Sequence, residues 1–365
     1  MKISILKLVP KNWIIKYLGD KISVTYETKY RYKPHPVIFP KVIDIDENFI
    51  EAMALYLGDG SFQKNKHHAT FTNKDKDVCK FMWNFFCKRF GLTTEDVSCE
   101  IRYRSKKPII SEWSKELDIP KEAFKLRYYV RNRDETFHLQ INRTIFRQIF
   151  ESITKKVTDT NFIENKALRQ AFLRGLFAAE GSMGVMKDSP KPYLNYVSYH
   201  LSIYEEKLAY LIANALDLEN IRHTIFRREK DHSIVVRITG WDNYWKLWRA
   251  KTFELCGRKK TKFLNVAREL EINCLLSESF RAKLFSKIRI SQKELAKQLN
   301  SWQGNVSKMI NGELGITLNR LLILSKLSGI DQEEIKGHVE NVAVGRLTTI
   351  YDKGFVDLIL DLKTD

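Results

Sequence analysis

The chain has 365 residues, of which 44% are hydrophobic and 29% are charged, so it is long enough for two or three domains and wholesale disorder is excluded. The formal net charge is +18 at pH 7, and aromatic residues make up 12% of the chain. Aromatic side chains scattered among many lysines and arginines are typical of proteins that bind nucleic acid. A basic surface that only aids solubility is the less favoured interpretation.

The cysteines and the apolar runs limit the environment of the protein. Five cysteines form no CxxC pair and no ligand-like spacing with the eight histidines, so we expect reduced, mostly buried thiols and no structural zinc site. No segment approaches the roughly 18 apolar residues of a membrane span, and the first residues contain too short an apolar run for a secretory signal. We expect a cytoplasmic protein, or an organellar one if it is intron-encoded in an organelle, without a small-molecule cofactor.

Residues 1–45 are basic and strand-like, and prolines at positions 34, 36 and 40 end them in an extended stretch. They predict a strand-rich N-terminal extension. A small accessory sheet, an arm along DNA and a plain surface extension all remain open for it.

Two apolar helical runs, FIEAMALYLGDGSF and LRQAFLRGLFAAEGSM, end in a carboxylate followed by glycine. These pairs are Asp59 with Gly60 and Glu180 with Gly181. An acid at the carboxyl end of a helix is disfavoured by the helix dipole, so two such acids indicate that a cation is bound there. The glycine after each acid suits a left-handed residue that closes the helix.

Small residues recur four apart within both runs: Ala54 and Gly58 in the first, and Ala171, Gly175 and Ala179 in the second. This spacing places them on one face of each helix, where their lack of bulk lets two backbones approach closely. We therefore predict that the two helices pack through these faces and bring the two acids side by side.

The same order of elements follows each run. The first half continues with strands at 61–65 and 68–72, a helix at 74–89 and a strand at 97–104. A detour at 105–125 with a short helix, a hairpin at 128–142 and a helix at 143–153 follow. The second half continues with a strand at 182–186, a strand at 195–203, a helix at 205–216, a hairpin at 221–239 and a helix at 241–255. The fold class is therefore α+β, with tandem αββαββα repeats at 46–158 and 159–276, each with a largely antiparallel four-stranded sheet.

Strand alternation predicts polar side chains on the outward face of both sheets. Arginine, glutamine, asparagine and histidine on such a face suit a β surface that lies in the major groove of DNA. A merely hydrophilic face explains one strand, but it explains several strands in both halves less well. The predicted DNA-binding residues of the sheets are Ser61, Gln63, Asn65, Arg102, Arg104, His138, Gln140 and Arg237.

The motifs AMALYLGDG and LRGLFAAEG, each followed by strand, strand and helix, resemble the paired signature of the single-chain LAGLIDADG homing endonucleases. The resemblance covers roughly 46–274. It implies that the motif helices meet at a pseudo-twofold axis and that two sheets form a saddle over double-stranded DNA. The implied activity is that of a monomer that cuts both strands of a long asymmetric site and leaves short 3′ overhangs.

The resemblance also implies that Asp59 and Glu180 bind divalent metal, usually Mg²⁺ with Mn²⁺ as a substitute, beside Gly58 and Ala179. Carboxylates suit such hard cations, and the cation can activate water and stabilise the leaving 3′ oxygen. The alternative is a pair of polar helix caps, which is less favoured because two acids at a buried seam repel each other without a cation.

Further catalytic positions follow from the same resemblance. The family often has a polar residue at the end of the second strand, which corresponds to Asn73 and, in the second half, to about Tyr204. It often has a lysine at the end of the fourth strand, near Arg143 and Thr239 here, and this sequence lacks that lysine. We predict Asn73 and Arg143 as catalytic residues, with Lys74 as another source of the cation.

Residues 277–337 contain three predicted helices, at 292–299, 302–311 and 318–327, and resemble the helix-turn-helix of phage Cro- and repressor-type proteins. They predict a small all-α DNA-binding domain, followed by a tail at 338–365; a three-helix packing domain without a DNA role is the alternative. The basic bridge at 256–270 is expected to lie along the DNA backbone. By this resemblance five residues contact DNA, the first two at base edges and the others at phosphates: Gln303, Asn305, Ser307, Lys308 and Gln292.

We therefore predict a site-specific double-strand DNA endonuclease, free-standing or intron-encoded. A catalytically weak or inactive DNA-binding regulator on the same scaffold and an intron RNA maturase are the alternatives. The presence of both acids favours the enzyme, whereas the missing lysine favours the regulator.

Overall fold

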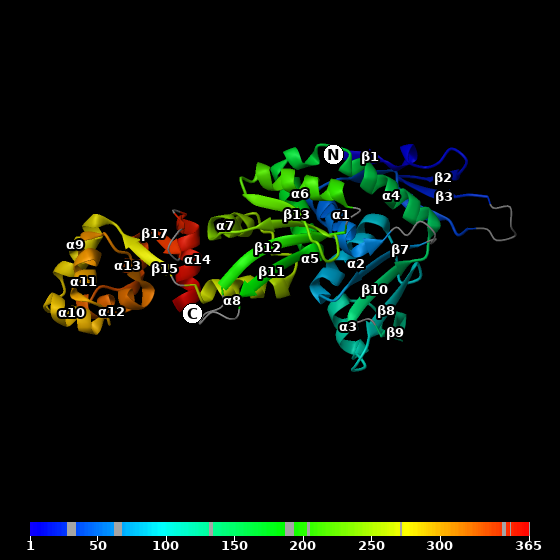
Figure 1. Cartoon of the computed structure of the whole chain (residues 1–365). Helices are drawn as coiled ribbons and strands as arrows, with labels where there is room; N and C mark the ends of the chain where they lie inside the picture. Colours follow the sequence, from blue (N-terminus) through cyan, green and yellow to red (C-terminus); the bar gives the residue numbers. More distant parts are fainter. Residues whose placement is uncertain are drawn as a thin grey trace. The chain divides into compact units, whose positions relative to one another are not determined.

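The computed structural model describes residues 1–27, 34–61, 68–130, 134–186, 193–202, 205–270, 272–344, 348–350 and 352–364. The chain divides into two compact units. One comprises Met1–Ser182, Val197–Ile238 and Leu247–Lys260, and the other comprises Met183–Tyr196, Thr239–Lys246 and Thr261–Asp365. Helices and antiparallel sheets occur in both (Figure 1), which confirms the predicted α+β class.

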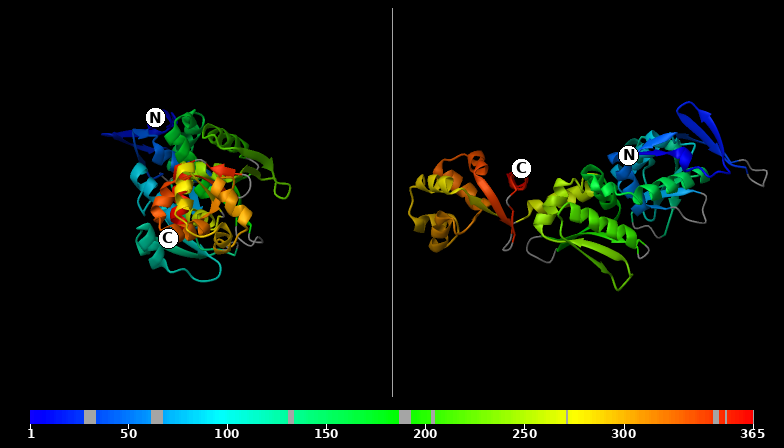
Figure 2. Two further views of the ribbon diagram at one scale, coloured as in Figure 1. Left: turned by 90° about the vertical axis from the view of Figure 1, so that its left-hand side faces the viewer. Right: turned by 90° about the horizontal axis from the view of Figure 1, so that it is seen from above.

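The N-terminal extension is made of strands, as predicted. Strands β2 (Ile14–Leu18), β3 (Lys21–Thr25) and β4 (Val37–Pro40) form an antiparallel sheet, and β1 (Lys2–Ser4) pairs with β5 (Val42–Asp44). Figure 2 shows these strands in blue beside the helices of the first half.

The extension packs against the core of the first half. Phe39 of β4 is fully buried, and its ring centroid lies 6.4 Å from that of Phe90 and 6.3 Å from that of Phe146. An accessory sheet is thus the structure that these residues adopt, while a contact with DNA stays a prediction.

The two motif helices are α1 (Glu47–Asp59) and α5 (Lys166–Glu180). Each begins at a side chain that accepts a hydrogen bond from a first-turn N–H group. Asp46 accepts from Phe49 N at 2.9 Å, and Asn165 accepts from Leu168 N at 3.2 Å.

Helices α1 and α5 pack backbone to backbone through their small residues. A methyl group added at Gly175 would collide with the carbonyl oxygen of Glu51 and would lie 3.1 Å from Ala54 Cβ. Arg174 also forks onto the Glu51 carboxylate, with Nε–Oε1 and Nη2–Oε2 distances of 2.7 and 2.8 Å. The predicted close packing of the two motif helices is confirmed.

The first half contains a five-stranded sheet in the order β6-β7-β10-β8-β9. Helices α2 (Lys76–Phe90) and α4 (Thr144–Thr158) supply a core of packed phenylalanines, and the short helix α3 (Ile110–Leu117) lies in the predicted detour. The strands are β6 (Gly60–Ser61), β7 (Ala69–Asn73), β8 (Val97–Tyr103), β9 (Phe124–Tyr128) and β10 (Thr136–Ile141).

The predicted hairpin at 128–142 is wrong. Strand β9 runs parallel to β8, with Cys99 opposite Phe124, and β10 lies between β7 and β8. A parallel pair needs a long crossover connection, and the detour with α3 provides one. The detour therefore adds a fifth strand to the expected four.

The second half has the predicted four-stranded sheet, in the order β11-β12-β14-β13, and the antiparallel β13–β14 hairpin is confirmed. Strand β12 also pairs antiparallel with β14, with Ser198 opposite Arg237. The elements are β11 (Gly181–Met186), β12 (Tyr193–Leu201), α6 (Glu206–Leu218), β13 (His223–Arg227), β14 (Ile234–Ile238) and α7 (Trp241–Arg249).

The C-terminal region is not all-α. Its helices lie in the chain between β15 (Ile272–Leu276) and β17 (Val339–Val344), which pair antiparallel in a sheet ordered β16-β15-β17-β18. No local pattern reveals a pairing between strands so far apart in sequence. The remaining elements are α8 (Gly257–Arg268), α9 (Glu278–Ser286), α10 (Gln292–Gln298), α11 (Gln303–Asn311), β16 (Ile316–Thr317), α12 (Leu318–Ser328), α13 (Gln332–Gly337), β18 (Thr348–Ile350) and α14 (Lys353–Thr364).

Two further predictions concern the whole chain. All five cysteines are free and four of them, Cys79, Cys99, Cys256 and Cys274, are buried, as predicted. Within the described ranges, none of the helices has both the length and the apolar character that crossing a membrane requires.

Candidate active site

The carboxyl ends of α1 and α5 touch. A methyl group added at Gly58 would lie 2.5 Å from Ala179 Cβ and 2.9 Å from Glu180 Cγ. Asp59 follows Gly58 as the last residue of α1, and Glu180 is the last residue of α5. The structure thus brings Asp59 and Glu180 together, and we call them the acid pair.

The glycines after the acids do not adopt the predicted left-handed conformation. Gly60 has φ −94° and Gly181 has φ −71°, both in extended backbone. A side chain at either position would instead collide with the preceding helical turn, at Tyr56 after α1 and at Phe177 after α5. Glycine is required here because the chain turns sharply against its own helix as it enters β6 or β11.

The acid pair is electrostatically unfavourable without a cation. Burial raises the pKa of Asp59 to about 6. Burial, and then the negative charge of Asp59, raises the pKa of Glu180 to about 7. Each carboxylate also lies at the negative end of its helix, so a bound cation would stabilise both.

Asn73, at the end of β7, is hydrogen-bonded to the acid pair. Its Nδ2 donates to Asp59 Oδ2 at 2.6 Å, and its Oδ1 accepts from the N–H group of Asp75 at 2.7 Å. Asn73 is only 9% exposed, and both ends of its amide are engaged. It therefore holds the Asp59 carboxylate in one orientation.

Arg143 and Lys74, the residues predicted to supply positive charge to the site, form ion pairs with acids outside the acid pair. Arg143 Nη2 lies 3.0 Å from Asp96 Oδ1, and Lys74 Nζ lies 2.7 Å from Asp134 Oδ2. The second-half position at Tyr204 lies outside the described residues.

The cation beside the acid pair comes from α8. Lys259 Nζ donates to the carbonyl oxygens of Phe177, Ala178 and Ala179 at 2.7, 2.8 and 3.3 Å, and its positive charge attracts both Asp59 and Glu180. The residue is 6% exposed, and burial lowers its pKa.

The expectation that residues 256–270 lie along DNA is therefore wrong for Lys259. A signal for its burial was present in the sequence. Phe263, Val266 and Ala267 follow Lys259 at the spacing of one helical stripe and are all buried. Five consecutive basic and polar residues, at 258–262, hide that stripe in the sequence.

The first turn of α8 is fixed to the start of α2. Arg258 forks onto Asp75, with Nε–Oδ1 and Nη2–Oδ2 distances of 2.7 and 2.9 Å, and the Gly257 N–H group donates to Asp77 Oδ2 at 2.5 Å. Burial alone would raise the pKa of Asp75, but its bonds to Arg258 hold that pKa below the usual value. Hydrogen bonds thus connect Arg258 through Asp75 and Asn73 to Asp59.

Several predicted DNA-binding residues share one face of the first sheet. The register aligns Gln140 with Thr70 and Ser98, and aligns Ser61 with Thr70. Arg104 is exposed just beyond the end of β8. Gln63 and Asn65 lie outside the described residues.

His138 and Arg102 also lie on this face, but they are less free than predicted. His138 is 6% exposed because Thr72 and Glu100 flank it in the register, and its Nδ1 lies 2.7 Å from Thr72 Oγ1. Burial, and then the charge of Arg102, lowers its pKa to about 4, so the ring is neutral at pH 7. The Arg102 guanidinium lies 3.2 Å from the Glu100 carboxylate.

Arg237 lies on the polar face of the second sheet. Ser198 of β12 and Thr224 of β13 stand opposite it in the register. Its guanidinium carbon lies 4.5 Å from the centroid of the Phe226 ring, in cation–π geometry.

Helices α10 and α11 present the residues predicted to contact DNA. Val306 and Met309 anchor α11 in the interior of its unit. Trp302, directly before α11, is 84% exposed. On the surface of these helices, Gln292, Gln303, Asn305 and Lys308 are exposed and Ser307 is half-buried.

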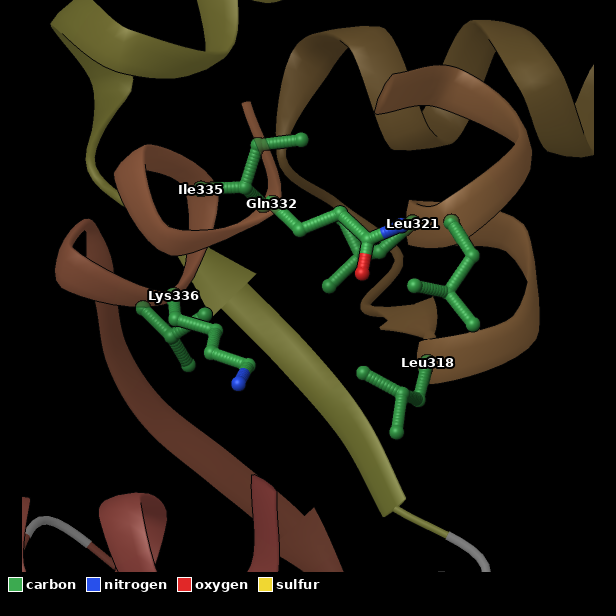
Figure 3. A pocket seen from close by; sticks show the side chains of 7 residues that line it. Leu318, Leu321, Gln332, Ile335 and Lys336 are labelled. Atoms are coloured by element: carbon green, nitrogen blue, oxygen red, sulfur yellow. The ribbon is translucent and has the colours of Figure 1, made fainter. Parts of the chain in front are cut away.

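A cavity between α12 and α13 does not offer a second site (Figure 3). It is lined by Leu318, Leu321, Gln332, Ile335 and Lys336, among others, and its volume is about 10 Å³. This is room for about one water molecule, so the cavity is too small for an organic ligand.

Residues 167–249 match the family model of a LAGLIDADG-like domain. No curated protein matches the sequence.

Similar solved structures include the homing endonuclease I-DmoI in complex with DNA and Ca, at 15% identity, covering 55% of this chain and 88% of that one with a TM-score of 0.33. The full-length DUF199/WhiA protein from Thermatoga maritima has 14% identity, with 76% and 92% of the two chains covered and a TM-score of 0.34. The meganuclease I-SmaMI, bound to uncleavable DNA, has 10% identity, 79% and 98% coverage and a TM-score of 0.35. The stretch 167–249 that matches the LAGLIDADG-like model includes all of α5 except its first residue, and it includes Glu180.

Proposed function

We propose that the chain is a site-specific endonuclease that hydrolyses phosphodiester bonds in double-stranded DNA. The observation that carries this proposal is the acid pair at the touching ends of α1 and α5. Two carboxylates at the negative ends of two helices are costly to the fold and serve it poorly as caps. The LAGLIDADG-like match, which includes Glu180 and nearly all of α5, supports the same interpretation.

Asp59 and Glu180 would hold a divalent cation, Mg²⁺ or in its place Mn²⁺, beside the backbone at Gly58 and Ala179. Their hard oxygen donors fit such an ion. Within the described ranges, no three His, Cys, Asp or Glu side chains are grouped so that they could hold a metal ion by themselves, so water and a DNA phosphate would complete the ligand set. When bound, the cation supplies a Lewis acid for the phosphoryl group.

The chain's own residues orient the reaction. Water attacks phosphorus and the bond to the 3′ oxygen breaks, which leaves a 5′ phosphate and a 3′ hydroxyl group. Asn73 fixes one carboxylate oxygen of Asp59 at 2.6 Å, so the other oxygen keeps a constant direction. One acid would serve each DNA strand, and cuts offset in this way leave short 3′ overhangs.

The two polar sheet faces and the C-terminal helices would bind the DNA. We propose that repeats at 46–158 and 159–276 are related by a pseudo-twofold axis, so that a monomer reads a long asymmetric site. Gln140 and Arg237 on the sheets, and Gln303 and Asn305 on α11, have the side chains that pair with base edges. The helices within 277–337 would act as a helix-turn-helix module. The net charge of +18 favours phosphate contacts throughout.

A DNA-binding regulator is the second candidate, and Lys259 is the observation that favours it. Its ammonium group already supplies positive charge to the acid pair. A protein that binds DNA without cutting it would need no further cation there.

A cleavage selection on a plasmid library distinguishes the two candidates. The library carries candidate insertion sites and is incubated with the full chain in Mg²⁺ or in EDTA. The endonuclease proposal expects linear plasmid from a narrow set of sites in Mg²⁺ only. Tight sequence-specific binding without any cut in Mg²⁺ would favour the regulator.

A further inference from the structure

Lys259 closes the carboxyl end of α5 with a full set of hydrogen bonds. An ammonium group has three donors, and three consecutive carbonyl oxygens, those of Phe177, Ala178 and Ala179, lie 2.7–3.3 Å from its Nζ. All three carbonyls lie in the last turn of α5, at the negative end of its dipole, and the Phe177 oxygen also accepts a hydrogen bond from the Gly181 N–H group.

The ammonium group is held in place from several sides. Lys259 is 6% exposed, and its Nζ lies 5.2 Å from the centroid of the Phe177 ring. The neighbouring Arg258 is clamped to Asp75 by two bonds of 2.7 and 2.9 Å. Lys259 is therefore a fixed part of the site and differs from a mobile surface lysine.

The backbone carbonyls at the end of α5 bind the ammonium group of Lys259, and the two carboxylates are left for a divalent metal ion. The donors of Lys259 are used by carbonyls, so the lone pairs of Glu180, and those of Asp59 that Asn73 does not use, remain for a metal ion. The charge of Lys259 still acts on both carboxylates. Ala179, whose carbonyl adjoins the acid pair, already accepts a bond from Lys259.

We propose that Lys259 is a built-in cation that replaces one of the two divalent ions that two carboxylates could otherwise bind. The acid pair then shares a single divalent ion. The inference rests on the proposed function for the kind of ion, and its test measures ion binding, which does not depend on cleavage. One shared ion also predicts unequal cutting of the two strands, so that nicked plasmid accumulates before linear plasmid.

The direct test counts Mn²⁺ ions bound to the full chain by electron paramagnetic resonance. Lys259→Gln keeps an amide donor for the carbonyls but removes the charge. Lys260→Gln is the matched control, because Lys260 is the next residue and pairs with Glu254 at 3.0 Å. We expect Lys259→Gln to bind one ion more than the wild type and Lys260→Gln to bind the same number. Equal numbers in all three proteins would overturn the proposal.

A second variant keeps the test decisive if Lys259→Gln does not fold. Glu180→Gln leaves Asp59 and Lys259 with no net charge, so a shared ion should be lost entirely. If the wild type bound two ions and Glu180→Gln kept one, each carboxylate would have its own ion and Lys259 would replace none. Absence of DNA cleavage would argue against the proposed endonuclease activity. The number of bound Mn²⁺ ions tests the proposal about Lys259 separately.

Discussion

Replacement of Glu180 by glutamine should stabilise the metal-free protein at alkaline pH. Burial and the neighbouring Asp59 raise the pKa of Glu180 from 4.5 to about 7. The folded state therefore holds this proton more tightly than the unfolded state, so stability is greatest below pH 4.5 and falls as the pH rises toward about 7.

The size of the effect follows from the same values. At about 1.36 kcal/mol for each pH unit, the ionised carboxylate costs the fold roughly 3 kcal/mol above both pKa values. Glu180 keeps some solvent contact and is attracted by Lys259, so we expect a net gain of about 1–2 kcal/mol for Glu180→Gln at about pH 8.

Urea unfolding in EDTA measures this gain at a series of pH values. The difference between Glu180→Gln and the wild type should shrink as the pH falls from about 7 to about 4.5. Glu340→Gln, at an exposed position of β17, is the control for loss of a surface carboxylate. A Glu180→Gln protein that is equally or less stable at about pH 8 would refute the description of the acid pair.

Three further predictions concern packing, positioning and DNA binding. Gly175→Ala should lower the free energy of unfolding by about 1–3 kcal/mol, because the added methyl group meets the α1 backbone. Gly304→Ala, with open space around it, should be neutral or slightly stabilising, and urea unfolding compares the two. Arg258→Ala should cost about 1–2 kcal/mol above pH 5 and less as the pH falls below 3.8, because Asp75 then takes up a proton and no longer needs its partner. Unfolding curves above pH 5 and well below pH 3.8 test this. Gln303→Ala should weaken DNA binding by about 1–3 kcal/mol and change the footprint at one end of the site, and an unchanged footprint would exclude a base contact.

Local patterns in the sequence predict much of the fold. Helices α2, α6, α10, α11 and α12 begin and end within about two residues of their predicted bounds, because their apolar spacing is regular. The small residues of the motif helices predict the close approach of α1 and α5, since only a small side chain fits at Gly58 and Gly175.

Long-range pairings are the part that local patterns miss. Strand β9 lies between the predicted detour and the predicted hairpin, and the crossover through α3 makes it parallel to β8. His138 alternates outward as expected, but cross-strand neighbours bury it. The sequence does not predict the role of Lys259, because Asp59 and Glu180, on which its charge acts, lie on two other helices. A basic segment by itself predicts a solvated or DNA-binding face.

The central claim is that the acid pair cuts DNA, and Asp59→Asn tests it most directly. Supercoiled plasmid with a selected site is incubated in Mg²⁺ with wild type or variant, while a footprint in Ca²⁺ measures binding of both to the same site. We predict that the wild type linearises the plasmid, and that Asp59→Asn gives the same footprint but no cut. Normal cutting by Asp59→Asn would contradict the assignment of the acid pair.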